Sequence, residues 1–356
     1  MSARLFEPLA LGKITVPNRI AVPPMCQCRA DGGLPQAWHS MHYAKMACSG
    51  AGLVMVEATA VQMNGRITTR CLALTDDAQQ EGLARLVASC KSVAPETKIF
   101  LELSHAGRKG GRRDPALGRG TAAGDEGGFA LVAPSASRYD DSYPEARALT
   151  EEEIFGIITA FAQAARRAGA AGFDGLVLHA AHGYLLHQFL SPVTNRRTDA
   201  WGKDVAGRRR FVLEVLKAVL GAVPEMPVMM RVSAGDGVPG GWTMDDAVAL
   251  LKEARALGLT AAEASPGGLT PEQRLPEPSV AAHAGRARRI RSETGLMSYA
   301  VGCITDPMQA EAVLEGGDAD GVGIGREMIR NPNWGWMAAN VLHEAVQVPV
   351  PYWPVF

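Results

Sequence analysis

Three side chains suited to proton transfer and hydrogen bonding follow one short apolar segment of the chain. The segment 176–178 reads Leu-Val-Leu, and His179, His182 and Tyr184 come directly after it. A short apolar run bounded by Gly is typical of a buried parallel strand, and α/β barrels place their reactive groups at the carboxyl ends of such strands. A single histidine is more often a core or loop residue, whereas three such groups at one strand end favour a site. We therefore expect these three residues to share a catalytic pocket.

The elements that would position this pocket alternate regularly along the chain. Apolar runs of strand length are followed by segments with helical spacing of apolar residues. The expected strands are 20–25, 53–60, 98–105, the apolar part of 172–184, 227–233, 260–265, 296–301 and 321–325. The expected helices are 38–49, 76–92, 150–170, 208–221, 244–257, 281–294, 307–314 and 332–345. Eight such repeats predict an α/β fold, a (β/α)8 TIM barrel that forms a single domain over residues 1–356.

Two long polar segments interrupt this alternation, around residues 107–148 and 191–207. Loops of this length in a compact domain are usually functional or mobile. A doubly wound sheet is the structural alternative, but it normally carries a glycine-rich turn after its first strand. Here the first expected strand ends in PPMC at 23–26, which cannot form that turn.

The composition gives no reason to expect a nucleic-acid or membrane partner. The chain of 356 residues has a formal net charge of −1 and is 47% hydrophobic, which is enough for a sizeable core. The N-terminus has no long apolar run, so we expect neither a signal peptide nor a membrane anchor. The six cysteines are scattered, which is typical of a protein in the reducing cytoplasm rather than of a disulfide framework. Cys26 and Cys28 have no second Cys or His pair at ligand spacing, so no metal is expected there.

Glycines after the last two expected strands indicate a phosphate site. Gly302 precedes an expected helix, and the segment 323–326 reads Gly-Ile-Gly-Arg. Loops after the seventh and eighth strands of TIM barrels often bind phosphate through backbone N–H groups, and Arg326 can add a charged contact. Arg231 stands inside the apolar run of the fifth expected strand, where it needs an anionic or hydrogen-bonding partner. A bound cofactor and a neighbouring buried acid are both open as that partner.

Longer motifs show a family resemblance. The chain carries PPMCQ at 23–27, LSHAGRK at 103–109, HAAHGYLLHQFLSP at 179–192, NRRTD at 195–199 and GIGRE at 323–327. With these motifs it resembles the old yellow enzyme family of FMN-dependent ene-reductases, in the shorter, thermophilic-like or xenobiotic-reductase branch. The resemblance covers nearly the whole chain, and the third and fourth motifs together are highly specific.

The resemblance implies that FMN lies at the carboxyl-terminal mouth of the barrel, with NADPH or NADH as the reductant. Cys26 would lie near flavin N5, and Arg231 would stabilise the anion that forms near N1 and O2 on reduction. Ala58 and Glu102 would meet the pyrimidine edge. The full set of expected cofactor contacts is Pro24, Met25, Cys26, Ala58, Glu102, Arg231, Gly302, Gly325 and Arg326.

The resemblance also implies roles at the substrate. His179 and His182 would hydrogen-bond the carbonyl or nitro oxygen of a small-molecule substrate, which polarises its C=C bond. Flavin N5 would deliver hydride to the β-carbon, and Tyr184 would protonate the α-carbon. The implied enzyme is a cytoplasmic, FMN-dependent NAD(P)H oxidoreductase of the ene-reductase type, and a homo-oligomer, either a dimer or a tetramer.

Two residues depart from the family pattern. Cys28 stands where this branch usually has a substrate-facing Tyr, so we expect Cys28 to line a wider substrate pocket. Glu102 stands where the family usually has Gln, and we expect an ionised carboxylate that lowers the reduction potential of the flavin. Near the C-terminus, Tyr352 or Trp353 would either enter the site of a neighbouring subunit or act as a hydrophobic plug.

Other functions are compatible with the same residues. A dehydrogenase or isomerase on this scaffold would remove hydride from a saturated ketone or amine. A flavin-free barrel would use His179 and His182 as metal ligands, although the sequence offers no obvious carboxylate ligand set. A non-catalytic phosphate-binding barrel would use only the two glycine sites.

Overall fold

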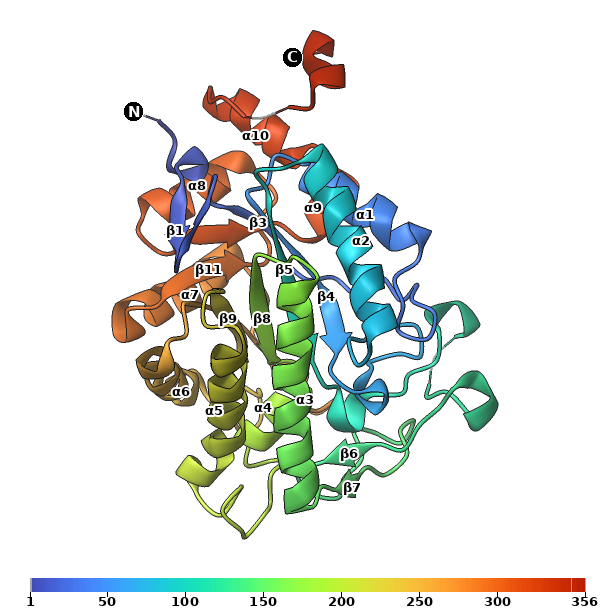
Figure 1. The fold of residues 1–356 in the computed structure, drawn as a ribbon. Coiled ribbons are helices and arrows are strands. Elements are labelled where there is room, and N and C mark those ends of the chain that lie inside the picture. The colour runs from blue at the N-terminus through green and yellow to red at the C-terminus, as the bar shows by residue number, and fades with distance from the viewer. Residues whose placement is uncertain (1, 119, 347, 356) are drawn as a thin grey trace.

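The computed structural model describes residues 2–118, 120–346 and 348–355 and shows a closed parallel β-barrel inside a ring of helices (Figure 1). The barrel strands, in their order around the barrel, are β3 (Ile20–Val22), β4 (Leu53–Ala60), β5 (Lys98–Ser104), β8 (Gly175–Ala180), β9 (Val228–Ser233), β10 (Ala261–Ser265), β11 (Met297–Val301) and β12 (Gly321–Gly323). The last strand pairs with the first, which closes the barrel. The predicted (β/α)8 barrel is confirmed, and a doubly wound sheet is excluded.

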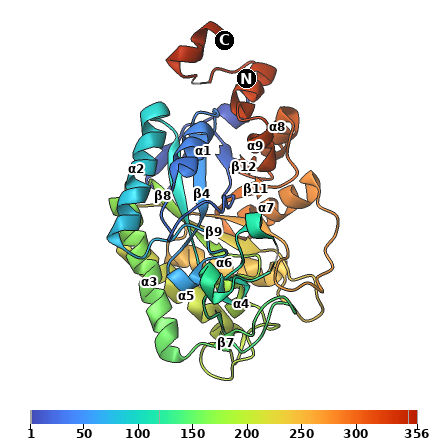
Figure 2. The same ribbon diagram turned by 90° about the vertical axis from the view of Figure 1, so that its right-hand side faces the viewer.

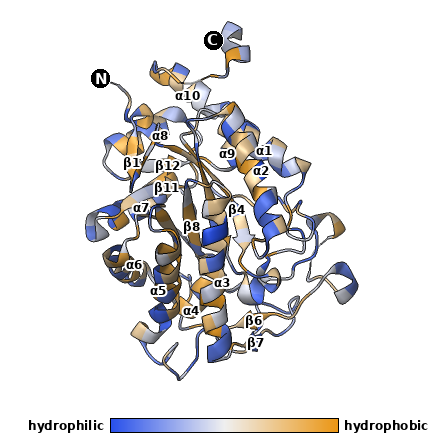
Figure 3. Cartoon of the chain, in the orientation of Figure 1, coloured by the Kyte–Doolittle hydropathy of each residue, from blue (hydrophilic) through white to orange (hydrophobic). Residues whose placement is uncertain are grey.

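The helices that surround the barrel follow the strands in sequence. The longer ones are α1 (Ala37–Ala47), α2 (Asp77–Val93), α3 (Glu151–Ala170), α5 (Val205–Ala222), α6 (Met244–Leu257), α7 (Val280–Thr294) and α8 (Pro307–Glu315). Figure 3 shows apolar and polar residues alternating along α3 and α5, as expected for helices with one face on the barrel and one in solvent. Within the described residues, no helix is long and apolar enough to cross a membrane.

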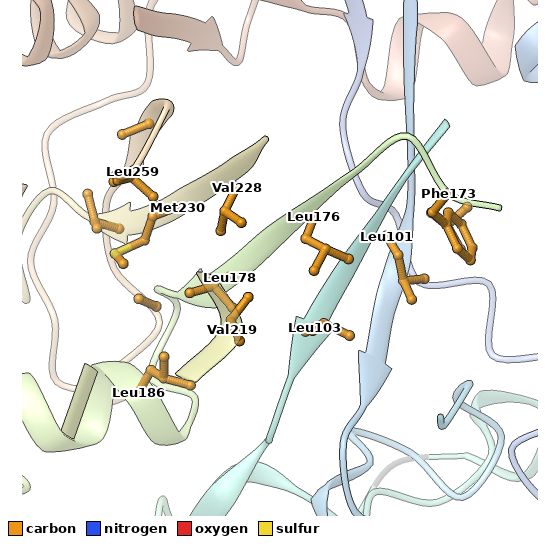
Figure 4. Packing of buried hydrophobic residues seen from close by; sticks show 14 of the residues in the cluster. Leu101, Leu103, Phe173, Leu176, Leu178, Leu186, Val219, Val228, Met230 and Leu259 are labelled. Atoms are coloured by element: carbon orange, nitrogen blue, oxygen red, sulfur yellow. The ribbon is translucent and has the colours of Figure 1, made fainter. Parts of the chain in front are cut away.

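Strand residues alternate between the inside of the barrel and the helices. On β5 and β8, Leu101, Leu103, Leu176 and Leu178 belong to the large cluster that packs against the helices, where Val219 of α5 joins them (Figure 4). Their sequence neighbours fill the interior, where a second cluster includes Phe100, Val177, Met229 and Tyr299. Because side chains on a strand point alternately to its two faces, this pattern fixes which residues face inward at the mouth of the barrel.

A hairpin closes the end of the barrel where the strands begin. Its strands are β1 (Leu9–Leu11) and β2 (Ile14–Val16), paired antiparallel, and its Leu9, Leu11 and Val16 pack on the interior cluster. The sequence analysis did not predict this hairpin. Both termini also lie at this end, whereas the short strands β6 (Val132–Ala133) and β7 (Arg147–Ala148) lie at the opposite end, where the barrel strands finish (Figure 1 and Figure 2).

Several predicted boundaries differ from the observed ones for local reasons. The first strand ends at Val22 rather than residue 25, because Pro23 and Pro24 have no N–H group to donate to a neighbouring strand. Helix α5 begins three residues earlier than expected, because the Asp204 carboxylate accepts the Gly207 N–H at 2.7 Å and caps its first turn. The long segment 107–148 is partly ordered by short turns and by β6 and β7. The last expected helix, 332–345, is observed as the shorter α10 (Trp334–Leu342), and the short α9 (Arg326–Arg330) before it was not predicted.

Candidate active site

Four polar side chains form a layer inside the barrel near the carboxyl ends of its strands. Glu102, His179, Arg231 and Glu263 come from β5, β8, β9 and β10, and the register pairs His179 with Arg231 and Arg231 with Glu263. Nδ1 of His179 lies 3.7 Å from Oε1 of Glu102, and Nε of Arg231 lies 2.5 Å from Oε1 of Glu263. The buried acid Glu263 is therefore the anionic partner of Arg231 in this structure.

Burial determines the charge of this layer. Burial raises the pKa of Glu102 to about 8. The charge of Arg231 opposes this rise, and the nearby carboxylate of Glu263 adds to it. Glu102 therefore holds its proton near pH 7, and the expectation of an ionised carboxylate is wrong for this structure. Burial, with Arg231 acting in the same direction, lowers the pKa of His179 well below its usual value. The imidazole is neutral and presents one N–H group as a hydrogen-bond donor.

The structure brings together the three residues that the sequence analysis placed in one pocket. His179 is on β8, and His182 and Tyr184 follow in the turn before α4 (Leu185–Leu190). The ring centroid of His179 lies 5.1 Å from that of His182 and 5.0 Å from that of Tyr184. Burial lowers the pKa of His182 and raises the pKa of Tyr184 well above its usual value. The site therefore offers two neutral imidazoles beside a phenol that keeps its proton.

The turn that carries His182 has an uncommon backbone conformation. His182 has φ of +57° and Gly183 has φ of +73°, and a Cβ on Gly183 would lie 2.2 Å from the Gly268 carbonyl oxygen. Left-handed backbone costs a non-glycine residue about 1–2 kcal/mol, so surrounding contacts must hold it. The N–H of His182 donates to Ser233 Oγ at 3.1 Å, and Lys109 Nζ donates to the His182 carbonyl oxygen at 2.7 Å.

A buried polar network supports the same turn. The N–H of Gly183 donates to Nδ1 of His187 at 2.9 Å, and Nε2 of His187 lies 2.9 Å from Oδ1 of Asp236. The other Asp236 oxygen accepts from Ser191 Oγ at 2.6 Å and from the N–H of Trp242 at 2.7 Å. The sequence analysis assigned no role to these residues or to Lys109. His187, Ser191 and Lys109 lie within the HAAHGYLLHQFLSP and LSHAGRK motifs, which was their only signal, and Asp236 and Trp242 had none.

Cys28 and Tyr184 pack against the same small apolar cluster. Cys28 is half-buried and has φ of +52°, and the cluster consists of Ala58, Ile67, Cys71 and Ala106. A hydrogen bond with Cys71 and burial raise the pKa of the Cys28 thiol, so the group stays protonated. Cys26, two residues earlier, is exposed. Cys28 therefore shares its apolar cluster with the predicted site residue Tyr184, and its role at the substrate stays a prediction.

The two predicted phosphate-binding glycines lie after β11 and β12. Gly302 has φ of +127°, and a Cβ there would lie 2.6 Å from Nε2 of His283, so only glycine fits beside this ring. Gly325 lies next to Met25, since a Cβ on it would be 3.7 Å from the Met25 sulfur. Arg326 follows at the start of α9 and is exposed. The glycine sites and the segment after β3 therefore lie at one rim of the barrel.

These residues fit FMN. Oε1 of Glu102, Nδ1 of His179 and Oε2 of Glu263 are buried and have no hydrogen-bond partner within the described part of the chain, while Nε of Arg231 and Oε1 of Glu263 form an ion pair with each other. A flavin ring supplies carbonyl, ring nitrogen and N–H groups that can pair with such atoms. No group of three or more His, Cys, Asp or Glu side chains in the described residues is arranged to hold a metal ion.

The C-terminal turn lies at the other end of the barrel from this site. Tyr352 and Trp353 are 51% and 62% exposed, and the Tyr352 ring packs edge-on against Trp336 at 5.8 Å. A hollow of about 860 Å³ beside this turn is lined by residues of 345–353 and by the ends of α1 and α2, and contains none of the predicted site residues. Within one chain, these aromatic residues are therefore remote from the histidine pair.

Comparison with known proteins gives a consistent result. The profile of the NADH:flavin oxidoreductase / NADH oxidase family matches residues 4–344. An NADPH dehydrogenase of Geobacillus thermodenitrificans (strain NG80-2) is 38% identical over 354 residues, which are 99% of this chain and 98% of that protein. A 2-naphthoyl-CoA reductase superposes with a TM-score of 0.86 at 25% identity, over 96% of this chain and 53% of that one. The old yellow enzyme from Trypanosoma cruzi superposes with a TM-score of 0.78 at 27% identity, over 98% and 94% of the two chains.

The match extends over nearly the whole chain, and it agrees with the barrel and with the residues at its mouth. The chain therefore belongs to the NADH:flavin oxidoreductase / NADH oxidase family, the family of the old yellow enzymes, and is an FMN-dependent oxidoreductase that uses a nicotinamide reductant.

Proposed function

We propose that this oxidoreductase is an ene-reductase, which reduces the activated C=C bond of α,β-unsaturated carbonyl or nitro compounds. The observation that carries this proposal is the grouping of His179, His182 and Tyr184. The ring centroid of His179 lies 5.1 Å from that of His182 and 5.0 Å from that of Tyr184. Reduction of such a bond places negative charge on the substrate oxygen and requires a proton at the neighbouring carbon. Two neutral imidazole donors beside a protonated phenol meet both needs.

When bound, FMN supplies the hydride for the β-carbon after taking it from NADPH or NADH. The remaining steps belong to the chain. His179 and His182 donate N–H hydrogen bonds to the substrate oxygen and stabilise its developing charge. Tyr184 gives the proton of its hydroxyl group to the α-carbon. Cys28 and the apolar cluster behind it exclude water and receive the hydrocarbon part of the substrate.

The cofactor contacts follow from the arrangement of the barrel mouth. We assign the pyrimidine edge of FMN to Ala58, Glu102 and Arg231, since Glu102 presents an unpaired buried oxygen and Arg231 belongs to the same polar layer at the barrel mouth. We assign the ring contacts to the segment after β3 and the phosphate to the rim after β11 and β12, with Pro24, Met25, Cys26, Gly302, Gly325 and Arg326 as the contacting residues.

We also propose a cytoplasmic homo-oligomer with a small-molecule substrate and a single domain over residues 1–356. All six cysteines are free, which agrees with a reducing compartment. The exposed Tyr352 and Trp353 offer apolar surface for contact with another subunit.

The test is a two-step spectroscopic experiment on the purified protein. The expected protein is yellow and loses its visible absorbance when NADPH or NADH is added without oxygen. Addition of a cyclic enone then restores the absorbance and yields the saturated ketone. If the enone has no effect and a saturated ketone or amine instead bleaches the oxidised protein, the enzyme is a dehydrogenase on the same scaffold. A protein that stays colourless after FMN is added would contradict both the ene-reductase and the dehydrogenase assignment.

A further inference from the structure

Lys109 touches both loops that build the substrate side of the site. It ends the short turn η3 (Gly107–Lys109) directly after β5. Its Nζ donates to the carbonyl oxygens of His182 and Gly268, and the first of these bonds is 2.7 Å long. The same Nζ lies 5.2 Å from the ring centroid of Tyr184 and 4.6 Å from that of Tyr139. One ammonium group therefore contacts the His182 turn and faces the ring of the phenol that is to give up a proton.

This ammonium has no carboxylate partner. Within the described ranges no ion pair includes Lys109, and its hydrogen bonds go to backbone carbonyl oxygens. The charged and titratable groups around it are Arg108, Arg112, Tyr139, Asp140, His179, His182 and Tyr184. Arg108 and Arg112 oppose its charge, and Asp140 favours it. A largely buried ammonium without a counter-ion is unfavourable for the fold, so it is a candidate for a role in the reaction.

We propose that Lys109 is a positioning residue for proton transfer: it fixes the His182 turn and stabilises the negative charge left on Tyr184 when its phenol protonates the substrate. This inference rests on the proposed ene-reductase function. In the step, the O–H bond of Tyr184 breaks and a C–H bond forms at the α-carbon of the substrate. The electron pair of the broken bond stays on the phenolate oxygen, which solvent later protonates.

The geometry supports both parts of this role. A cation within about 5 Å of the ring stabilises a phenolate by an amount that corresponds to roughly 10- to 100-fold in rate at an interior site. The hydrogen bond to the His182 carbonyl oxygen anchors a residue whose φ of +57° needs outside support. Loss of that bond would let the imidazole of His182 move away from the substrate oxygen.

The charge of Lys109 depends on pH in the neutral range. Burial lowers its pKa to about 7, with Arg108 and Arg112 acting in the same direction and Asp140 opposing them. The ammonium is therefore present below pH 7 and lost above it. The proton-transfer step should slow as pH rises through this value, while reduction by the nicotinamide should not follow the same curve.

Three substitutions separate charge from hydrogen bonding. Lys109→Gln keeps an N–H donor without the charge, Lys109→Met removes both, and Lys109→Arg keeps a charge that does not titrate. Lys91→Met is the control for loss of a lysine bonded to a backbone carbonyl oxygen: Lys91 donates to the Gly172 carbonyl oxygen at 2.9 Å and, unlike Lys109, also pairs with Asp174, and it lies on α2 far from the site. Each holoenzyme is first checked for its FMN spectrum and melting temperature, and Lys109→Gln replaces Lys109→Met if the latter does not fold.

The two half-reactions are then measured separately from pH 6 to pH 9. We expect Lys109→Gln and Lys109→Met to slow enone-dependent reoxidation about 10- to 100-fold at pH 6, with nicotinamide-dependent bleaching little changed. The fall in rate above pH 7 should disappear in both, and Lys109→Arg should be fast and independent of pH up to 9. Lys109→Met alone should also raise KM for the enone, because it removes the hydrogen bond that holds His182 in place. Unchanged pH profiles, or an equal loss in both half-reactions, would overturn the proposal.

A binding measurement separates this inference from the proposed function. We expect 4-chlorophenol to bind about 10-fold more weakly to Lys109→Gln than to the wild type at pH 6, and equally at pH 9, with Lys91→Met unchanged. If the wild type and Lys109→Gln differ in phenol binding as expected but the wild type reduces no enone, the ene-reductase assignment fails and the electrostatic role of Lys109 stands. If enones are reduced and the phenol binds all variants alike, the proposal for Lys109 is wrong.

Discussion

Nδ1 of His179 lies 3.7 Å from Oε1 of Glu102, and the two residues are only 3% and 2% exposed. Both groups are neutral near pH 7, because burial raises the pKa of Glu102 to about 8 and lowers that of His179. The contact is thus a neutral pair rather than a salt bridge. Glu102 lies at the expected pyrimidine edge of the flavin, and His179 lies at the expected site of the substrate oxygen. A change of charge at Glu102 should therefore alter both the flavin potential and the hydrogen bond to the substrate.

The first prediction concerns the flavin midpoint potential. Below pH 8 the protonated Glu102 can donate a hydrogen bond as Gln would, so wild type and Glu102→Gln should have similar potentials at pH 6–7. Above pH 8 the wild-type carboxylate ionises and repels the negative charge of the reduced flavin, so its potential should fall below that of the variant. Spectroelectrochemical titration from pH 6 to 9.5 measures this. A constant offset between the two proteins at every pH would show that Glu102 does not titrate in this range.

The second prediction concerns stability and follows from the same pKa. In the unfolded chain Glu102 ionises near its usual value of 4.5, whereas in the fold it keeps its proton up to about pH 8. The folded state therefore binds more protons between these values, so the wild type should lose stability relative to Glu102→Gln as pH rises from 5 to 8. The difference should reach a few kcal/mol, on the order of 2–4. Urea unfolding of the FMN-loaded proteins gives the comparison, and parallel curves would contradict the raised pKa.

The third prediction concerns the histidine pair. His179→Ala or His182→Ala should reduce kcat/KM for a cyclic enone by about 100- to 1,000-fold, since each removes one donor to the developing oxyanion, worth about 2.7–4 kcal/mol. Binding of 4-chlorophenol should weaken as well, while FMN content should not change. Steady-state kinetics and a spectral titration provide the measurements. Full turnover in both variants would remove the assigned role.

The fourth prediction concerns Tyr184. Tyr184→Phe keeps the ring that packs beside His179 and on the apolar cluster near Cys28 but removes the proton donor. Enone-dependent reoxidation should slow by about 100-fold or more, within the usual contribution of a general acid, while bleaching by NADPH stays the same. Rapid mixing of each half-reaction separates the two effects. An unaffected oxidative half-reaction would mean that another group supplies the proton.

The fifth prediction concerns Cys28. Cys28→Tyr fills space next to the apolar cluster on which Tyr184 packs, and it should lower kcat/KM for bulky enones more than for small cyclic ones. Cys28→Ser is the matched control, because it changes the polarity but hardly the volume. The ratio of kcat/KM for a large and a small enone is the measurement. An equal response of both substrates to Cys28→Tyr would place Cys28 outside the pocket.

The sequence predicted the barrel because each strand and helix leaves a local pattern of apolar residues, and the eight observed strands overlap the eight expected ones. It also placed His179, His182 and Tyr184 together, because a strand and its following turn fix neighbours in space. The hairpin β1–β2 was missed, since its two short strands precede the first barrel strand and are not part of the strand–helix alternation that identified the others.

Contacts between segments that are far apart in the chain could not be predicted from local sequence patterns. The contact of Lys109 with the His182 carbonyl joins two loops 73 positions apart, and only their packing brings them together. The protonation of Glu102 was predicted wrongly for a similar reason. Its burial and the ion pair between Arg231 and Glu263 depend on four strands that meet at one level of the barrel, which the sequence of β5 alone does not reveal.

The pairing of β12 with β3, through Val322 with Ile20 and Gly323 with Ala21, has a consequence during synthesis. The N-terminal strand leaves the ribosome early, but its partner follows about 300 residues later, which takes roughly 15–60 s at about 5–20 residues per second. Throughout that interval one side of β3 has no strand to pair with, and an unpaired edge promotes aggregation. The nascent chain is therefore exposed to misassembly until almost all of it has been translated, so its yield should depend on chaperones and on translation rate more than that of a fold built from local pairs.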